Sequence, residues 1–503
     1  MANDPNTIQY VIQEDGFWYI ASKDRTPGVP EITVSSKGVA NGLSTEYNDG
    51  YDFGPDSYNP SVTSGVALTQ SSGIQEAINY VHAQQGGKIT LSPGRFTLSA
   101  DLPLTKVVEK FEPFVSYYGP LYSYLSMPTV ATSGTANAIE IDIEGSGGLN
   151  QPSQGGIGIT FGNNTIIDAT ALNPQTSPAY YNSIMYTVLF SGGGSNSSII
   201  SNLIVLVNSP FLSGITISGN SNVGKNVLVQ NMNGLPPASV YDNPNDSTVS
   251  TGATEPFQWG FYIDAEYGVC GTVENVQANY FDTGIILGSN INAIQISSNI
   301  CRNGLGLTGD FVPRVGTFVP QVISNSTISL AGYLNGTVII GTILGTDDTS
   351  AYGDQQDIIC ETGTYHQGIE VQSFHMETPN QTVSPRLPYI KSSNFFPYPS
   401  SFRFSNLWSG LSQQIIDGTT AGTINMTLKE YGNISTKYIL ALDGYENDTT
   451  TNQAITFPIA FLTAVAVMVN TTGLTIAVTT TGITITSPDA TTTYSGIIVI
   501  EGY

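Results

Sequence analysis

The middle of the chain repeats a short unit of alternating apolar residues about once every twenty residues. Between 199 and 344, pieces such as SGITISG, WGFYIDA, TGIILGS and NGLGLTG stand between Asn and Gly residues. Gly284 and Gly304 are twenty residues apart, and so are Asn279 and Asn299. A period of this length suits one coil of a solenoid, with Asn stacked at the turns and Ile, Val and Leu stacked inside.

Pairing between successive coils makes parallel sheets without crossover helices. Each inward side chain then stacks on its neighbours, and we expect Ile285, Ile294 and Leu305 to lie in this dry core. The composition agrees, because 53 Gly, 27 Pro and 27 Tyr residues are typical of many turns and short strands. An all-α architecture is excluded.

An amphipathic helix is predicted ahead of the solenoid, after an N-terminal β-rich segment over residues 1–50. Ser72 and Gln75 have the spacing of a capping box, in which two side chains satisfy N–H groups at a helix start. Gly86 and Gly87 end the run. The apolar residues that recur at i, i+3, i+4 and i+7 are Ile74, Ala77, Ile78 and Val81. They predict one buried helix face.

Three motifs occur together around this helix: YDFGPD from Tyr51, SGIQEAIN from Ser72 and GGKITLSPGRFTLS from Gly86. This arrangement resembles the opening of right-handed parallel β-helix proteins of the pectate-lyase-like superfamily. In particular it resembles the tailspike and fibre branch found in phages and archaeal viruses. The resemblance implies that the helix caps the solenoid, that the glycine-rich stretch forms its first coil, and that the β-helix covers residues 51–390.

The pattern changes after the aromatic and proline-rich stretch 391–415, which we interpret as a linker. Residues 416–503 contain short alternating strands between Gly- or Thr-rich turns, which predict an antiparallel β-sandwich. The segment from Phe457 to Val467 and the final GIIVI are similar to C-terminal receptor-binding or trimerising domains of viral fibres. The predicted fold is all-β: a right-handed parallel β-helix with an N-terminal capping helix, followed by a C-terminal antiparallel β-sandwich.

The charge balance excludes several partners. The chain carries 15 basic and 39 acidic side chains, for a net charge of −24, and Lys225 is the one basic residue between Lys110 and Arg302. A groove in this region does not neutralise phosphates, which argues against nucleic acid and acidic lipid. The N-terminus has no signal-peptide pattern, and the apolar run 454–470 alternates like strands. We expect no membrane insertion.

No metal site or cofactor is predicted. The three cysteines, Cys270, Cys301 and Cys360, lack the spacing of a zinc site, and we expect them to be buried small hydrophobes. One acidic loop is a weak candidate for Ca²⁺ without the order of a calcium loop: Asp347, Asp348, Asp354 and Asp357. A second acidic row either binds a cation or faces water: Glu140, Asp142 and Glu144. We expect solvated carboxylates in both places.

Two carboxylates on one predicted strand are the candidate catalytic pair. Asp264 and Glu266 alternate with Tyr262, and a two-residue strand step of about 6.5–7 Å fits inverting glycoside hydrolysis. Tyr262 and Trp259 are the candidate sugar platforms. The carboxylates on nearby coils that would complete such a site are Glu274, Asp282 and Asp310. The alternative is a solvent-facing polar edge without catalysis.

A tyrosine-rich stretch, FVSYYGPLYSYL, is the second candidate for glycan contact. Tyrosine faces stack on sugars while their hydroxyl groups hydrogen-bond. The four candidates are Tyr117, Tyr118, Tyr122 and Tyr124. The alternative is that these side chains form the core of a loop.

Together with the resemblance, these features favour a virion spike or fibre that recognises a host cell-surface glycan. Such a protein would lie on the virion surface as a homotrimer, beside other virion proteins. A glycan depolymerase that uses Asp264 and Glu266 on the same scaffold is an alternative, and a purely structural virion or surface-layer component is a third. The sequence leans away from an enzyme, because the carboxylate patterns of the best-known hydrolases of the superfamily are absent.

Overall fold

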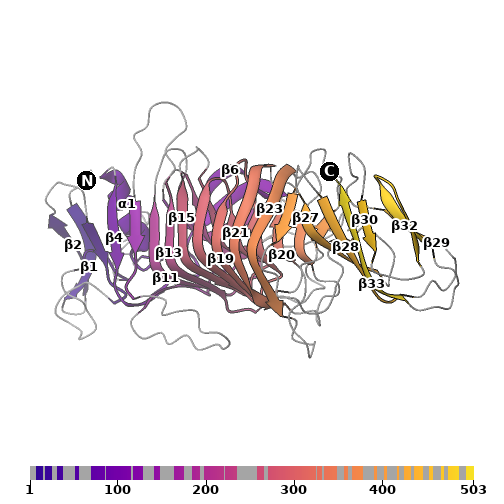
Figure 1. The fold of residues 1–503 in the computed structure, drawn as a ribbon. Coiled ribbons are helices and arrows are strands. Elements are labelled where there is room, and N and C mark those ends of the chain that lie inside the picture. Colours follow the sequence, from indigo (N-terminus) through magenta and orange to yellow (C-terminus); the bar gives the residue numbers. More distant parts are fainter. Residues whose placement is uncertain are drawn as a thin grey trace. The chain divides into compact units, whose positions relative to one another are not determined.

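The computed structural model divides the chain into two compact units, one with the described residues up to Arg302 and one with those from Asn303 onward. Both units consist mainly of strands (Figure 1). The structure describes residues 7–14, 17–24, 31–37, 51–55, 69–84, 86–114, 117–127, 141–147, 164–174, 184–192, 198–219, 221–234, 258–265, 270–323, 326–330, 333–347, 356–360, 365–377, 390–392, 401–404, 416–417, 424–431, 436–445, 452–456, 466–469, 474–486 and 494–502.

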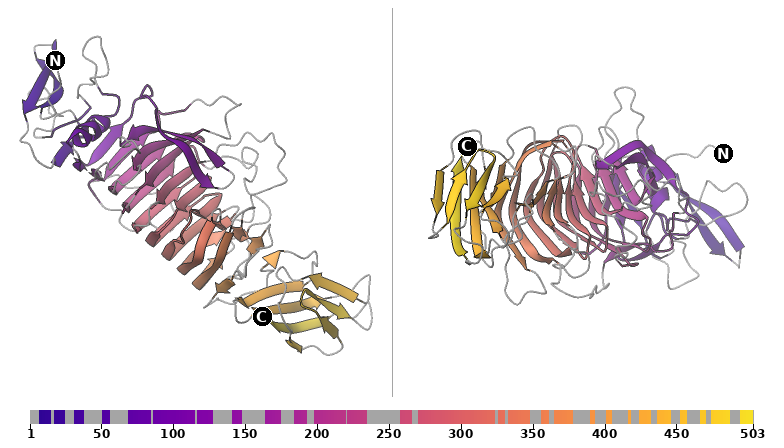
Figure 2. Two further views of the ribbon diagram at one scale, coloured as in Figure 1. Left: turned by 90° about the horizontal axis from the view of Figure 1, so that it is seen from above. Right: turned by 90° about the vertical axis from the view of Figure 1, so that its right-hand side faces the viewer.

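Two sheets built from successive coils form most of the first unit (Figures 1 and 2). In one, here named the buried sheet, the hydrogen-bonded order is β6 (Thr105–Phe114), β7 (Tyr117–Ser126), β10 (Met185–Gly192), β12 (Leu212–Ser218), β14 (Trp259–Asp264) and β16 (Thr283–Leu287). In the other, the open sheet, it is β3 (Glu31–Val34), β4 (Gly87–Leu91), β8 (Ile141–Glu144), β11 (Ile199–Val207), β13 (Val223–Asn231), β15 (Gly271–Asn279) and β17 (Ile291–Asn299).

These pairings are parallel between successive coils, which confirms the predicted parallel β-helix. The short strands β5 (Gly94–Thr97) and β9 (Thr165–Ala169) extend the open sheet, because β9 pairs with both β5 and β11. Strand β6 is the exception, since it pairs with β7 in the antiparallel direction. The two sheets also differ in burial. Every residue of β10 and β16 is buried, whereas the outer face of the open sheet is partly exposed.

The twenty-residue period appears directly in the register between β15 and β17. Val273 pairs with Ala293, and Asn279 pairs with Asn299, as expected for stacked turns. Ile285 is fully buried in the first unit and Leu305 in the second, so both lie in the core as predicted. The prediction for Ile294 is wrong, because this side chain is 50% exposed.

The pairing of β17 with the neighbouring coils explains the error at Ile294. Asn202, Asn226 and Asn275 have φ angles of 57°, 53° and 53°, and they lie opposite one another on β11, β13 and β15. Such a residue interrupts the strand alternation, so that two consecutive side chains face outward. On β17, Gln295 lies opposite Asn275, and both Ile294 and Gln295 are exposed. A strict period of two therefore assigns Ile294 to the wrong face.

The predicted helix is α1 (Ile74–Ala83), and its buried residues confirm the apolar spacing: Ile74, Ala77, Ile78 and Val81. The predicted capping box is wrong. The helix starts at Gly73 with a φ of 85°, and the Ser71 hydroxyl, not that of Ser72, accepts the N–H of Gln75 at 3.0 Å. The Gln75 side chain instead donates to the Ser126 carbonyl and accepts the Ser126 N–H, which ties the helix to β7.

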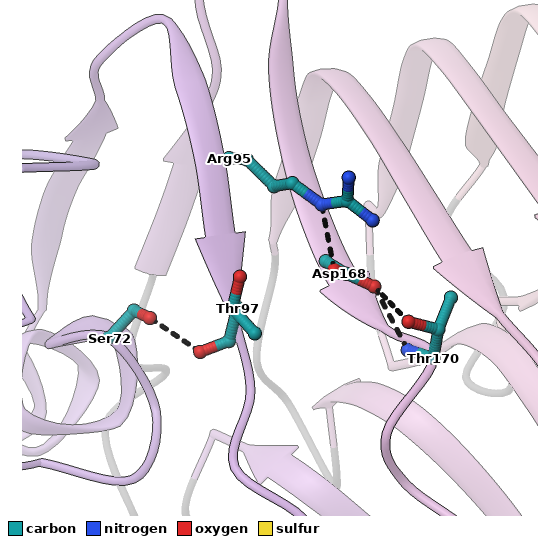
Figure 3. Close-up of polar contacts among 5 residues, drawn as sticks. All are labelled: Ser72, Arg95, Thr97, Asp168 and Thr170. Carbon is teal, nitrogen blue, oxygen red and sulfur yellow. Dashed lines mark hydrogen bonds and ion pairs between the residues drawn. The ribbon is translucent and has the colours of Figure 1, made fainter.

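The first coil is held by a small polar cluster beside the helix (Figure 3). Ser72 donates its hydroxyl to the Thr97 carbonyl at 2.6 Å, and Arg95 Nε donates to Asp168 Oδ2 at 2.7 Å. Burial alone would raise the pKa of Asp168, but hydrogen bonds from Thr170 and Arg95 outweigh it, and the pKa falls below its ordinary value. The ionised carboxylate thus locks β5 to β9.

Three strands lie within the predicted N-terminal segment. Strands β1 (Thr7–Glu14) and β2 (Phe17–Asp24) form an antiparallel pair. Strand β3 pairs in parallel with β4, and Val34 forms a further parallel bridge with Phe53. The open sheet therefore takes in residues that the sequence analysis assigned to the segment before the solenoid.

The second unit contains further parallel strands and two antiparallel sheets. One parallel series is β18 (Asn303–Leu307), β20 (Ser326–Leu330), β22 (Gln356–Cys360), β24 (Ile390–Ser392) and β26 (Ile416–Asp417), and the other is β19 (Arg314–Ile323), β21 (Tyr333–Asp347), β23 (Tyr365–Glu377) and β25 (Ser401–Phe404). The parallel pattern thus continues through β25, inside the stretch interpreted as a linker, and to β26, at the start of the region predicted to be a sandwich.

The C-terminal strands are antiparallel, as the sequence predicted for this region. One sheet has the order β27 (Ile424–Tyr431), β28 (Thr436–Tyr445), β33 (Tyr494–Gly502) and β30 (Ala466–Val469). The other has β29 (Asn452–Thr456), β32 (Gly482–Thr486) and β31 (Thr475–Val478). Their packing as a sandwich stays a prediction.

The cysteines follow the sequence expectation only in part. Cys301 is buried with a free thiol, as predicted, and burial raises its pKa to about 12. Cys270, just before β15, is exposed, so its prediction as a buried hydrophobe is wrong. Within the described residues, no helix combines the length and apolar character needed to cross a bilayer.

The coil register generates a matched pair of substitutions. Ile285→Asp should abolish soluble folding, because an unpaired carboxylate in the stacked core costs several kcal/mol. Ile294→Asp, nine residues farther along the chain on the exposed face of β17, should fold and melt within a few degrees of the parent. Circular dichroism melting of both variants tests this, and a soluble, cooperatively melting Ile285→Asp chain would contradict the stacked core.

Candidate functional site

Asp264, the first member of the predicted catalytic pair, has a structural role in the coil. It ends β14, and its Oδ1 accepts the N–H of Ser289, in the turn after the next strand of the sheet, at 2.7 Å. Its main-chain carbonyl accepts the side-chain amide of Asn222 at 3.0 Å. A Cβ added to Gly288 would lie 2.5 Å from Oδ1, so the carboxylate is closely enclosed. Glu266, its proposed partner, lies outside the described residues.

The supporting carboxylates do not gather around Asp264. Asp282 is buried and paired with Arg302, whose Nη1 lies 3.5 Å from Oδ1. Glu274 belongs to the open sheet and pairs with Lys225 at 2.7 Å, while Asp310 is an exposed residue of the second unit. Asp282 and Glu274 are thus each held in an ion pair with a basic side chain.

The predicted sugar platforms on β14 are covered, which is a correction to the sequence analysis. Trp259 is fully buried and Tyr262 is 4% exposed. The Phe111 ring of β6 lies 5.5 Å from the Trp259 ring and 5.0 Å from the Tyr262 ring, measured between centroids. The Trp259 indole N–H is also used, because it donates to the Thr216 hydroxyl at 3.0 Å. These aromatic side chains serve packing in the present structure.

The tyrosine-rich stretch forms strand β7, not the loop insertion expected from the sequence. Tyr124 is buried, and burial raises its pKa to about 12, so its ring is not a surface platform. Tyr122 is half-buried, with its ring centroid 6.1 Å from that of Tyr186. The side chains of Tyr117 and Tyr118 lie outside the described residues, so their glycan contact stays a prediction.

The acidic rows also have protein partners where they are described. Glu144 forms an ion pair with Lys88 of β4, and Asp142 Oδ1 accepts the N–H of Ile199. Glu140, Asp348 and Asp354 lie outside the described residues, as do the side chains of Asp347 and Asp357. In the part of the chain that is described, no three His, Cys, Asp or Glu side chains come together as a metal site.

The outer face of the open sheet over β13, β15 and β17 presents polar side chains to solvent, in contrast to β10 and β16 of the buried sheet, in which every residue is buried. We name it the amide face, and its residues are Lys225, Asn226, Glu274, Asn275, Asn292, Ile294 and Gln295, all exposed or half-buried. Asn275 Nδ2 donates to Asn226 Oδ1 at 3.0 Å, and Asn226 Nδ2 donates to Asn202 Oδ1 at 2.9 Å. A ladder of amides thus runs across three strands.

Sequence reasoning missed this ladder although a signal was present. The triplets SNL, KNV and ENV place Asn202, Asn226 and Asn275 between an outward polar residue and a buried aliphatic one. Asparagine adopts the left-handed backbone region more readily than most residues. A repeated polar–Asn–aliphatic triplet at coil spacing therefore predicts a stacked left-handed position. The sequence analysis placed asparagines at the turns of the solenoid, and therefore did not consider these asparagines within the strands.

The Phe111 side chain packs strand β6 against the aromatic residues of β14. Lys106 and Glu109 of this strand are exposed, its register against β7 shifts repeatedly, and Phe111 is buried. Phe111→Ala should therefore expose Trp259, because the substitution removes the ring that packs against the indole and leaves a cavity there.

Acrylamide quenching of Trp259 measures this in a chain whose other tryptophans, Trp18 and Trp408, are replaced by Phe. We expect quenching to increase several-fold for Phe111→Ala and to stay unchanged for Leu104→Ala, a partly exposed neighbour of the strand. Equal quenching in both variants would contradict the role of Phe111 in covering Trp259.

The buried carboxyls predict that moderate acid stabilises the fold. Burial raises the pKa of Asp282 to about 6, and burial raises the pKa of Glu76 as well. A carboxyl whose folded pKa exceeds its unfolded value contributes stability that is complete below the unfolded pKa of about 4 and is lost as pH rises through the folded pKa. The window for Asp282 is therefore pH 4 to 6.

Thermal midpoints at pH 7, 5.5 and 4 test this expectation. They should hold or rise toward pH 4, and Asp282→Asn should flatten the dependence, because the asparagine amide does not titrate. Asp168, with its lowered pKa, opposes the trend only below about pH 4. A fall of more than about 10 °C between pH 7 and pH 5.5 would overturn the prediction.

Comparisons with known proteins find distant likeness only. No family model matches the chain, and no curated protein matches it in sequence. Among solved structures, the chain is similar to the tailspike of Pseudomonas phage phi297, with 10% identity, a TM-score of 0.26, and coverage of 88% of this chain and 93% of that one. It is also similar to a tailspike protein of E. coli bacteriophage HK620, with 11% identity, a TM-score of 0.23, and 93% of each chain covered.

Proposed function

We propose that this chain is a virion spike or fibre protein of a phage or archaeal virus, and that it attaches the particle to its host by binding a cell-surface glycan. The motifs between Tyr51 and Ser99 support the proposal through their resemblance to tailspike and fibre proteins. The observation that carries it is the amide face, an exposed polar sheet surface on a parallel β-helix. Regular coils place like side chains in rows, which suits a long repetitive ligand.

The packing of Asp264 and of the aromatic residues beside it favours attachment over depolymerisation. Asp264 is held by main-chain and side-chain hydrogen bonds within the coil, and the aromatic platforms beside it are covered. A binding protein needs none of these groups to be accessible, whereas a hydrolase needs two carboxyls that face its substrate.

The C-terminal strands supply the reason to expect a homotrimer. In the antiparallel sheet of the described C-terminal residues, β27 and β30 are edge strands. Exposed strand edges invite further pairing unless a partner covers them, and closed symmetric assembly is the usual solution. Light scattering on the full chain should give a particle three times the 53.4-kDa chain mass. A monodisperse monomer would overturn this expectation.

Attachment is tested with the fluorescently labelled full chain and with cells of the host. The host is the organism whose cultures yield virus particles that contain this chain. The chain should be detected in those particles by mass spectrometry, should bind the cells, and should compete with particle adsorption. Mild periodate oxidation, which destroys sugar diols, should abolish the binding.

Each of the alternative results of this experiment would indicate a different function. Presence in particles without cell binding would indicate a structural virion component. Release of reducing sugar from the cell surface would indicate a depolymerase and return attention to Glu266. Undiminished binding after periodate treatment would indicate a protein receptor and overturn the proposed glycan.

A further inference from the structure

We infer that the amide face binds a neutral glycan chain, an inference that rests on the proposed glycan attachment. The face lies over β13 and β15, which Figure 1 labels, and over β17, which pairs with β15. The polar side chains there are exposed or half-buried. Its chemistry specifies the ligand class through the amides, the charges and the one apolar side chain that it presents.

The amide ladder is a fixed array of hydrogen-bonding groups. Asn226 and Asn275 stand on neighbouring strands, about 4.8 Å apart in the hydrogen-bonding direction. Each side-chain amide has two N–H donors, and the ladder uses one of them on each residue. The second N–H of each amide is held in place before a ligand arrives, so binding costs little side-chain entropy. Sugar hydroxyl groups, which donate and accept, match such an array.

The charges on this face cancel locally. Lys225 Nζ lies 2.7 Å from Glu274 Oε2, and both side chains are partly exposed, at 46% and 39%. Farther along the same outward row of the open sheet, Glu144 is paired with Lys88. An acidic glycan would find no surplus cation here, and it would approach a chain of net charge −24. A neutral glycan meets neither obstacle.

The apolar contribution comes from Ile294, which is 50% exposed beside the exposed Asn292 and Gln295. A pyranose ring has an apolar C–H face and a polar rim, so an isolated aliphatic side chain among amides fits one ring of the chain. Ile294 is also the one large hydrophobic residue that the amide face exposes. A stable protein interface buries a cluster of apolar or aromatic anchors, which this face does not supply. The occupant is therefore a glycan and not a second copy of the chain.

The experiment measures binding of the full chain to a printed array of microbial surface polysaccharides, sorted into neutral chains and chains with uronate, sialate or phosphate groups. We expect binding to neutral polysaccharides that changes less than about two-fold between 50 and 500 mM NaCl, because no charge pair forms on binding. The double variant Ile294→Thr/Gln295→Ala should weaken it at least about ten-fold.

Leu104→Thr is the matched control, because it also removes a partly exposed aliphatic side chain but lies away from the amide face. It should bind as the parent does. Asn292→Ala, a single substitution of an exposed residue, gives a second measure of the face if the double variant proves unstable in thermal melting. We expect it to weaken binding by a few-fold.

The outcomes separate this inference from the proposed function. Binding confined to acidic polysaccharides, or binding that falls steeply with salt, would overturn the neutral ligand. Binding to neutral chains that is equal in the face variants and the control would overturn the amide face while leaving glycan attachment in place. No binding to any polysaccharide on the array would overturn glycan attachment itself.

Discussion

Hydrogen bonding between successive coils in a fixed register is the constraint on which this structure depends. Once Val273 pairs with Ala293, every later residue of the two strands is stacked on its equivalent, and a slip of one residue would move a whole set of side chains to the opposite face. The core, the turn residues and the exposed rows are all consequences of that register. The burial of Ile285 and the exposure of Ile294 are two sides of the same constraint.

The register also decides where side chains are forbidden. A Cβ added to Gly214 would lie 2.4 Å from the carbonyl oxygen of Gly260, its partner in the next coil, and 2.2 Å from Val229 across the interior. A Cβ on Gly260 would meet the Gly284 carbonyl at 2.8 Å and Ala278 at 2.5 Å. The interior between the two sheets therefore leaves no room for a Cβ at Gly214 or Gly260. The turn-rich composition serves this packing as well as the loops.

Local sequence patterns predict most of the fold correctly. The errors at Trp259 and Asp264 arise from contacts with residues distant in the sequence. The face of α1 and the inward residues of β4 and β5 follow from spacing within a few residues, so the sequence predicts them. Burial of Trp259 depends on Phe111, about 150 residues away, and no pattern near WGFYIDA reveals it. The role of Asp264 depends likewise on Ser289, in the turn after the next strand. Both predictions were made from the sequence of one strand, which contains no information on the strands and turns that pack against it.

The same contrast explains why we assign the proposed recognition to the outer face of the open sheet. Along the buried sheet, outward side chains such as Trp259 and Tyr262 are packed beneath β6, so they contribute to packing and are not accessible to a ligand. On β13 and β15, left-handed asparagines interrupt the alternation of inward and outward side chains, so two adjacent side chains face outward, and β17 has such an outward pair at Ile294 and Gln295. Asn275 bonds to Asn226 on the next coil, which fixes this row, while the preceding position varies in charge and polarity among Lys225, Glu274 and Ile294. Because the ladder maintains the geometry, substitutions at the variable position can change the ligand without changing the coil. A solenoid of this kind separates the residues that hold its shape from those that select its partner.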